Sequence, residues 1–200
     1  MKYWNIFLII IATAFIAGCL PTSVHQLYTD EDVVFDSDLL GMWYDPDEPR
    51  GDVWSFSRRG IDSYHLEVFK EHDINTEPAA EFDVVMSEIG GKRYLDFFPR
   101  EPEDRDDFYN LHLVPTHSFY RINITMDNTT GRDRDTLWIG LFDLEWLEKN
   151  LENGRADLKH EKRDDMIVLT ASTLDLQEFV KQYSEEAFPI SEDVRLIRGK

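Results

Sequence analysis

Short apolar runs separated by turn-forming residues recur along most of this chain, and this pattern limits the folds that it can adopt. In 63–69 and 82–86 every second residue is apolar, which is the period of a strand with one buried face. Gly90 and Gly91 follow as a hairpin turn. Further strands are expected at 39–44, 53–57, 93–98, 120–126, 136–142 and, as the last, 166–171. Seven or eight short strands at close spacing favour an antiparallel sandwich or barrel.

Two segments have the period of a helix instead. In 144–151 leucines recur at intervals of three and four, after Asp143 as the N-cap and before Gly154 as the stop. The pattern at 172–183 is stronger, because Ser172 opens a capping box and apolar residues line one face. We therefore expect an all-β protein, an antiparallel sandwich or barrel of about eight strands with a short inserted helix and a C-terminal amphipathic helix.

The charge of the chain excludes one class of partner. Its 40 acidic residues against 21 basic ones give a formal net charge of -19. Such a chain repels phosphate backbones, so we expect no nucleic-acid partner. It should also repel anionic lipid headgroups. Two interpretations of the acidity stay open, solubility alone or a surface for a cation or a basic partner.

The single cysteine of the chain, Cys19, stands at the end of an apolar segment. Residues 6–17 carry no charge and are too few to span a bilayer comfortably, but they suit the apolar core of a signal peptide behind Lys2. The sequence Ile16-Ala17-Gly18-Cys19 resembles the lipobox of bacterial lipoproteins. The alternatives are an uncleaved membrane anchor and cleavage at another position.

The lipoprotein resemblance implies a processing scheme. Residues 1–18 would be the signal peptide, cut between Gly18 and Cys19, and the Cys19 thiol would carry diacylglycerol. Two or three acyl chains hold a protein stably on a membrane. The scheme makes 19–36 a lipidated tether and 37–200 the folded domain. Leu20 stands where this family uses aspartate for inner-membrane retention, which favours the outer membrane if the cell has one.

The run Leu39-Leu40-Gly41-Met42-Trp43-Tyr44 resembles the first strand of lipocalin-like proteins. In that family the Gly-x-Trp signature places a glycine where the chain bends into the barrel and a tryptophan across the closed end. Gly41 and Trp43 would take those places, and the resemblance implies that the strands form an antiparallel lipocalin-like barrel of about eight strands. The order of the expected elements is also similar to that family, and segments 115–119, 143–147 and 169–179 resemble a group of uncharacterised bacterial envelope proteins with such a domain.

Residues suited to catalysis or metal binding are present but poorly arranged. His112 and His117 lie five apart and would face opposite sides of a strand, so no metal site is expected. Ser118 follows His117 without a nucleophile-elbow motif, so we expect no hydrolase. The acidic run 101–107 lacks the spacing of a calcium loop and is expected to be a solvated surface.

The sequence thus predicts a membrane-anchored envelope protein without catalysis or cofactor. Two functions stay open. In the first, aromatic side chains line a barrel cavity that binds a small apolar ligand or a lipid. In the second, the core is filled and the acidic surface meets a protein partner. Ile122 and Ile139 are the inward-facing positions that alternation predicts for the barrel.

Overall fold

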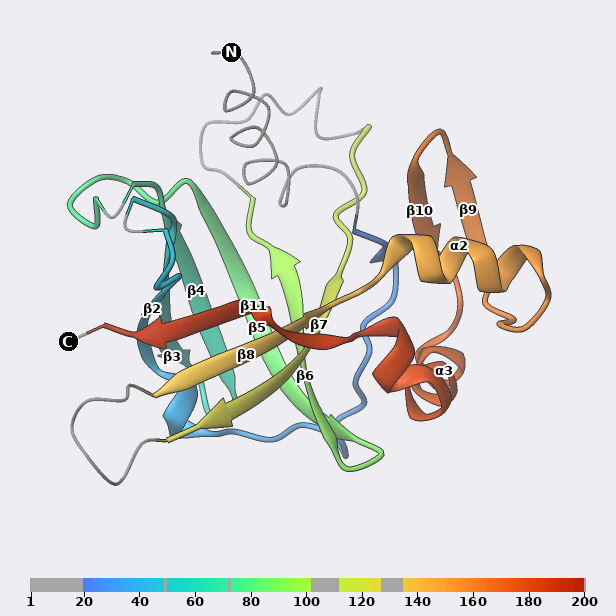
Figure 1. The fold of residues 1–200 in the computed structure, drawn as a ribbon, viewed down its shortest axis with the longest axis horizontal. Helices are drawn as coiled ribbons and strands as arrows, with labels where there is room; N and C mark the ends of the chain where they lie inside the picture. The colour runs from blue at the N-terminus through green and yellow to red at the C-terminus, as the bar shows by residue number, and fades with distance from the viewer. Residues whose placement is uncertain (1–19, 49, 72, 102–111, 127–134, 200) are drawn as a thin grey trace, which may run out of the picture.

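A closed barrel of eight strands forms the body of the molecule (Figure 1). The computed structural model describes residues 20–48, 50–71, 73–101, 112–126 and 135–199. Around the barrel the order is β11-β2-β3-β4-β5-β6-β7-β8, and all neighbours are antiparallel. The strands are β2 (Gly41–Tyr44), β3 (Val53–Arg59), β4 (Ser63–Phe69), β5 (Ala80–Ile89), β6 (Lys92–Pro99), β7 (Ser118–Thr125), β8 (Thr136–Leu141) and β11 (Ile190–Arg198). The predicted antiparallel barrel is confirmed.

Strand alternation fills the inside of the barrel with apolar side chains. Tyr64 and Leu66 of β4 are fully buried on the inner face, while His65 between them points outward. The buried inner core comprises Leu39, Trp43, Phe56, Tyr64, Leu66, Val84, Met86, Leu95, Phe97, Ile122, Leu137 and Ile139. The expected inward direction of Ile122 and Ile139 is correct, because the two pair across β7 and β8 and are 4% and 3% exposed.

The strand that closes the barrel is one that the sequence did not predict. Residues 166–171 were expected as the last strand, but β11 follows them and pairs with both β8 and β2. Its sequence is rich in charge, and only Val194 and Leu196 give it an apolar face. The strand is stable because its two neighbours supply backbone partners on both sides.

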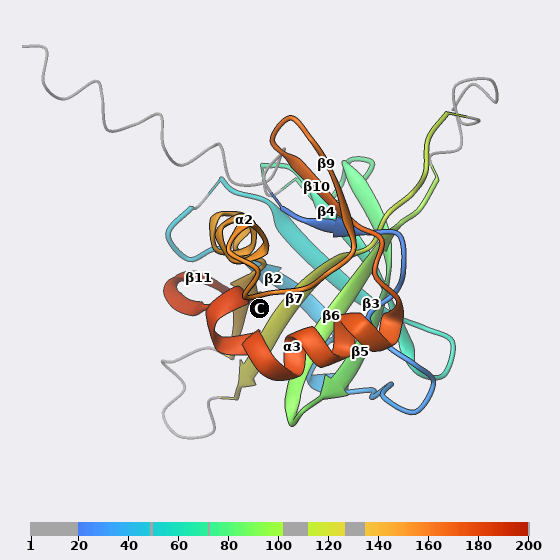
Figure 2. The ribbon, with the colours of Figure 1, turned by 90° about the vertical axis from the view of Figure 1, so that its right-hand side faces the viewer.

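The two predicted helices are confirmed, and they cover the outside of the barrel. α2 (Leu144–Glu152) begins after Asp143, whose carboxylate accepts a 2.9 Å hydrogen bond from Trp146 N–H. α3 (Thr173–Ala187) begins after Ser172 and ends one turn later than expected. It lies across the outer face of β5 and β6 in Figure 2. The amphipathic helix therefore precedes the last strand.

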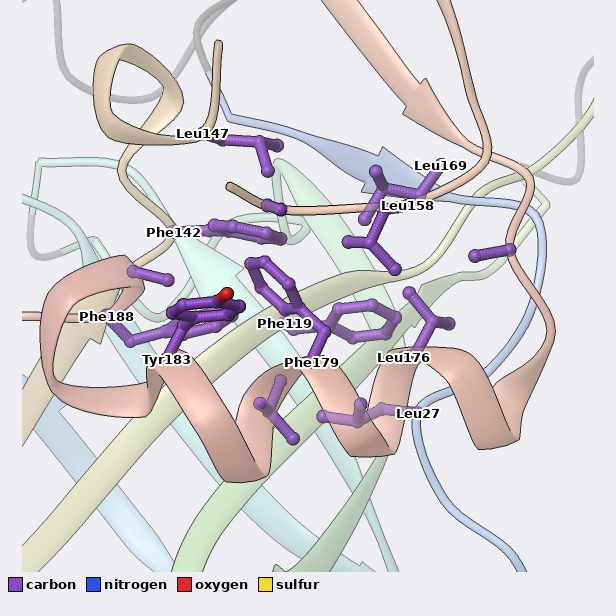
Figure 3. Close-up of a cluster of buried hydrophobic side chains, with 14 of the residues drawn as sticks. Leu27, Phe119, Phe142, Leu147, Leu158, Leu169, Leu176, Phe179, Tyr183 and Phe188 are labelled. Atoms are coloured by element: carbon purple, nitrogen blue, oxygen red, sulfur yellow. The ribbon is translucent and has the colours of Figure 1, made fainter. Parts of the chain in front are cut away.

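A second core lies between the helices and the barrel wall (Figure 3). Phe119 of β7 meets Phe142, Phe179 and Phe188 there, and all four side chains are buried. A small sheet borders this outer core, with the order β1-β10-β9 for β1 (Thr22–Ser23), β10 (Met166–Leu169) and β9 (His160–Arg163). Strands that are apolar on both faces, such as β8, are thus covered from inside and outside.

Residues 20–36, expected as a tether, instead pack along the outside of the barrel. Ser23 and His117 exchange two backbone hydrogen bonds of 2.9 and 2.7 Å. Leu27 is fully buried in the outer core, and Val34 N–H donates to the Met86 carbonyl at 2.9 Å. The segment has no regular period because its apolar side chains are buried one at a time along an extended path. The folded body therefore begins well before residue 37.

Candidate functional site

One end of the barrel is closed by a tryptophan and an arginine. Trp43 is fully buried, and its Nε1 donates a 2.8 Å hydrogen bond to the Leu39 carbonyl. The guanidinium carbon of Arg198 lies 4.4 Å from the centre of the Trp43 ring. The same guanidinium donates to the carbonyls of Leu40 and Asp38. These contacts join the 3-10 turn η1 (Ser37–Leu39) to the end of β11 and close the barrel here.

Gly41 and Trp43, the two positions singled out from the sequence, both belong to this closed end. Gly41 has a φ of 110°, and a Cβ at this position would lie 3.1 Å from Arg198 Nη1. Arg198 was not predicted as part of this end from the sequence. Its signal is the alternation of β11, since Val194 and Leu196 face inward and the next position with that direction is residue 198.

Tyr64 makes the closed end sensitive to high pH. Burial raises the pKa of Tyr64 to about 12, and its hydroxyl donates to the Asp36 carbonyl at 3.1 Å. Above pH 10 an unfolded chain loses this proton while the folded chain keeps it, so stability falls as pH rises from about 10 to 12. We expect a loss of about 2–3 kcal/mol from this residue. In Tyr64→Phe, denaturant midpoints measured against pH should show a shallower decline; an unchanged decline would contradict this assignment.

The opposite end of the barrel carries inward-facing side chains that are only half-buried. We call this set the mouth, and it comprises Trp54, Val68, Phe82, Tyr120, Leu141 and Val194. Trp54 and Val68 are register partners one residue from the ends of β3 and β4, and Leu141 is the last residue of β8. Side chains deeper in the barrel are at most 4% exposed. The mouth is therefore one part of the inner face that remains in contact with solvent, and Ile124 and Leu196 toward the other end are partly buried as well.

Aromatic rings beneath the mouth fill the barrel. The ring centre of Phe97 lies 5.6 Å from Trp54, 4.6 Å from Tyr120 and 5.5 Å from Phe82. Burial raises the pKa of Tyr120, so its hydroxyl stays neutral at physiological pH. The half-buried side chains of the mouth thus form an apolar surface that rests on the packed rings around Phe97. Such a surface can take apolar groups by burying them, with no charged group among its six side chains.

Other candidates from the sequence do not form a catalytic or metal site in the described structure. His117 Nδ1 is 2.6 Å from Asp96 Oδ1, on the outer side of the barrel wall. Ser118 Oγ contacts the Tyr120 hydroxyl at 3.5 Å, so His117 and Ser118 do not form a nucleophile–base pair. Within the ranges that the structure describes, no three His, Cys, Asp or Glu side chains gather as a metal site. Of the acidic run, 102–107 falls outside those ranges.

A small cleft on the outside of the barrel is a less suitable candidate for a ligand site than the mouth. It has a volume of about 130 Å³ and is lined by Glu148, Leu151, Glu152, His160, Lys162 and Ile167. Ligand sites usually enclose about 300–1,000 Å³. Two of its three charged side chains, Glu148 and Lys162, are already paired at 3.1 Å. We therefore take the mouth as the candidate site.

Comparison with known proteins identifies no relative of this chain, so its function is inferred from the sequence and the structure. No family model, curated protein or solved structure matches this chain. Gly18 and Cys19, the expected cleavage and lipidation positions, precede the first described residue. Among the residues from 20 onward that the structure describes, no helix combines the length and apolarity needed to cross a membrane.

Proposed function

We propose that this chain is a non-catalytic lipoprotein of the bacterial cell envelope that binds an apolar ligand at the mouth of its barrel. The observation that carries the proposal is the half-buried mouth, a ring of inward-facing apolar side chains opposite an end plugged by Trp43 and Arg198. A globular protein normally covers such side chains, and an apolar site with few polar groups is typical of ligand binding.

The ligand that suits this site has a narrow apolar part. The packed rings around Phe97 fill the barrel below the mouth, so only a short length of ligand would enter it. Binding then comes from apolar area removed from water, at roughly 25 cal/mol for each Å². An acyl chain end has the required shape and polarity. The neutral hydroxyl of Tyr120, which Ser118 Oγ contacts at 3.5 Å, is a polar atom of the mouth.

Attachment to the membrane through Cys19 is the second part of the proposal. Its support is the lipobox-like sequence and the absence of any other cysteine in the chain. Replacing the thiol in Cys19→Ser should abolish incorporation of a labelled fatty acid, because an oxygen does not take the diacylglyceryl group in this modification. Metabolic labelling measures this directly. Equal labelling of the Ser variant would rule out lipidation at Cys19.

A binding titration tests the mouth. The body from residue 20 onward should bind a fluorescent fatty acid saturably, at one site per chain. Leu141→Trp fills the mouth, and losing about 60 Å² of buried ligand surface should weaken binding roughly tenfold. Leu174→Trp is the matched control, because Leu174 is 66% exposed on α3 and should leave binding unchanged. Equal affinities of the two variants would contradict a site at the mouth.

An interaction lipoprotein with a filled core is the alternative. The observation in its favour is the packed inner core, whose twelve buried side chains leave the deeper barrel occupied. Its acidic surface would then meet a basic protein partner. In that case the titration shows no saturable binding, and Glu101, the described end of the acidic run, marks the first surface to test.

A further inference from the structure

The segment that follows Cys19 is attached to the mouth end of the barrel. Ser23 bridges to His117, the residue directly before β7, and Tyr120 of the mouth lies in that same strand. From there the segment runs the length of the barrel to its closed end, where Asp36 N–H donates to the Tyr64 hydroxyl at 2.7 Å. In Figure 1 this blue segment descends from β1 and passes beneath the barrel.

Two further contacts hold the segment in place. Leu27 N–H donates a 2.8 Å hydrogen bond to the buried carboxylate of Asp96, and Gln177 of α3 donates to the Leu27 carbonyl at 3.1 Å. Because the segment is fixed to the barrel wall on this path, the chain reaches Cys19 from the mouth end only.

The reach of the anchor is short compared with the barrel. Four residue steps separate Ser23 from Cys19, which is at most about 14 Å of extended chain. β7 has eight residues, about 26 Å along the strand. A lipid on Cys19 therefore lies close to the mouth end. While this lipid is inserted in a membrane, the closed end of the barrel cannot contact the same membrane.

Exposed apolar side chains lie on the same side of the molecule. We call them the anchor-side surface, and they are Leu113, Val114 and Met166, which are 39%, 74% and 55% exposed. Leu113 and Val114 lie four and three residues before His117 in the chain. Met166 lies two residues before Val168, the register partner of Thr22 in a parallel pair, so it lies on the Cys19 side of that pair.

We infer that the mouth end and the anchor-side surface face the bilayer that holds Cys19, and that the ligand is an acyl chain of a lipid from this bilayer. The inference rests on the proposed function, since it needs the lipid on Cys19. An acyl chain that passes directly from the bilayer into the mouth stays out of water. The hydrophobic effect favours its position in the bilayer and its position in the mouth over exposure to water. The lipid anchor thus orients the site as well as retaining the protein.

The anchor, and not charge, brings this end to the membrane. The loop 45–52 at the mouth end has four acidic side chains and one arginine. Anionic lipids repel such a loop. The matching surface is therefore a neutral bilayer, and the probe is a zwitterionic phosphatidylcholine vesicle.

Fluorescence quenching of the full lipidated chain on such vesicles tests the orientation. Val114→Cys places a label on the anchor-side surface, and Ile61→Cys places one in the β3–β4 turn at the closed end. Ile61 is 81% exposed, so both sites accept a label without disturbing the core. The thiol of Cys19 is occupied by lipid, so each variant has one reactive thiol. With nitroxide on the lipid headgroups, the label at 114 should be quenched several-fold more strongly than the label at 61.

Each other outcome overturns the inference. Equal quenching, or stronger quenching at 61, means that the mouth does not face the bilayer, while saturable fatty-acid binding by the body from residue 20 would still uphold ligand binding. Two labels per chain and failure to float with vesicles mean that Cys19 carries no lipid, which overturns the anchor and the inference together. Strong quenching at 114 with no saturable binding upholds the orientation and overturns the acyl-chain ligand.

Discussion

Trp43→Ala should lower the free energy of unfolding by about 3–5 kcal/mol, the largest effect that we expect from a single substitution. The side chain is fully buried at the closed end, and its ring carries the Arg198 guanidinium at 4.4 Å. Its loss leaves a cavity and removes the hydrogen bond to the Leu39 carbonyl. A domain typically has about 5–15 kcal/mol of total stability, so the variant should be close to unfolding. Denaturant unfolding of the body from residue 20 measures the change.

Trp138→Ala is the matched control for Trp43. Trp138 faces outward on β8, is half-buried, and donates a 3.1 Å hydrogen bond to Thr125 Oγ1. We expect a loss of about 1 kcal/mol there. Similar midpoints for the two alanine variants would contradict the assignment of Trp43 to the closed end.

Asp96→Ala should cost about 3 kcal/mol, the second large effect. Asp96 is 2% exposed on the outer face of β6, where its two oxygens bind Leu27 N–H at 2.8 Å and His117 Nδ1 at 2.6 Å. Alanine leaves both partners unsatisfied. It also frees the segment from 20 to 27, so limited proteolysis should cut there faster than in the parent protein.

The conservative change separates the carboxylate contacts from packing. Asp96→Asn keeps the shape and one acceptor oxygen, so it should lose less stability than Asp96→Ala. Asp175→Ala, on the exposed start of α3, is the surface comparison. If Asp96→Ala were no more destabilising than Asp175→Ala, the segment would not be held by this carboxylate.

Local periodicity explains why the barrel strands and both helices could be predicted. Alternation in 63–69 and 82–86 and the capping pattern at 172–183 reflect burial on one face. Such a pattern can be recognised within each segment, without knowledge of the segments that it contacts. β11 could not be found in this way, because its sequence is rich in charge and its pairing with β2 joins segments about 150 residues apart. The path of 20–36 was missed for a similar reason, since its contacts are made one residue at a time.

The candidate site depends on barrel closure and so was only partly predictable. Gly41 and Trp43 were singled out from a short motif, and alternation gave the correct inward direction of Ile122 and Ile139. The same alternation does not say which inward side chains are deep and which form the mouth. That difference requires the register of all eight strands and the position of Arg198 at the far end.

The most direct test of the ligand claim is native mass spectrometry of the body from residue 20, secreted into the envelope and purified without detergent. We predict a fraction of the protein with one bound lipid per chain, which is absent from Leu141→Trp and retained by Leu174→Trp. Bare protein alone in the parent spectrum, or equal lipid on both variants, would contradict binding at the mouth.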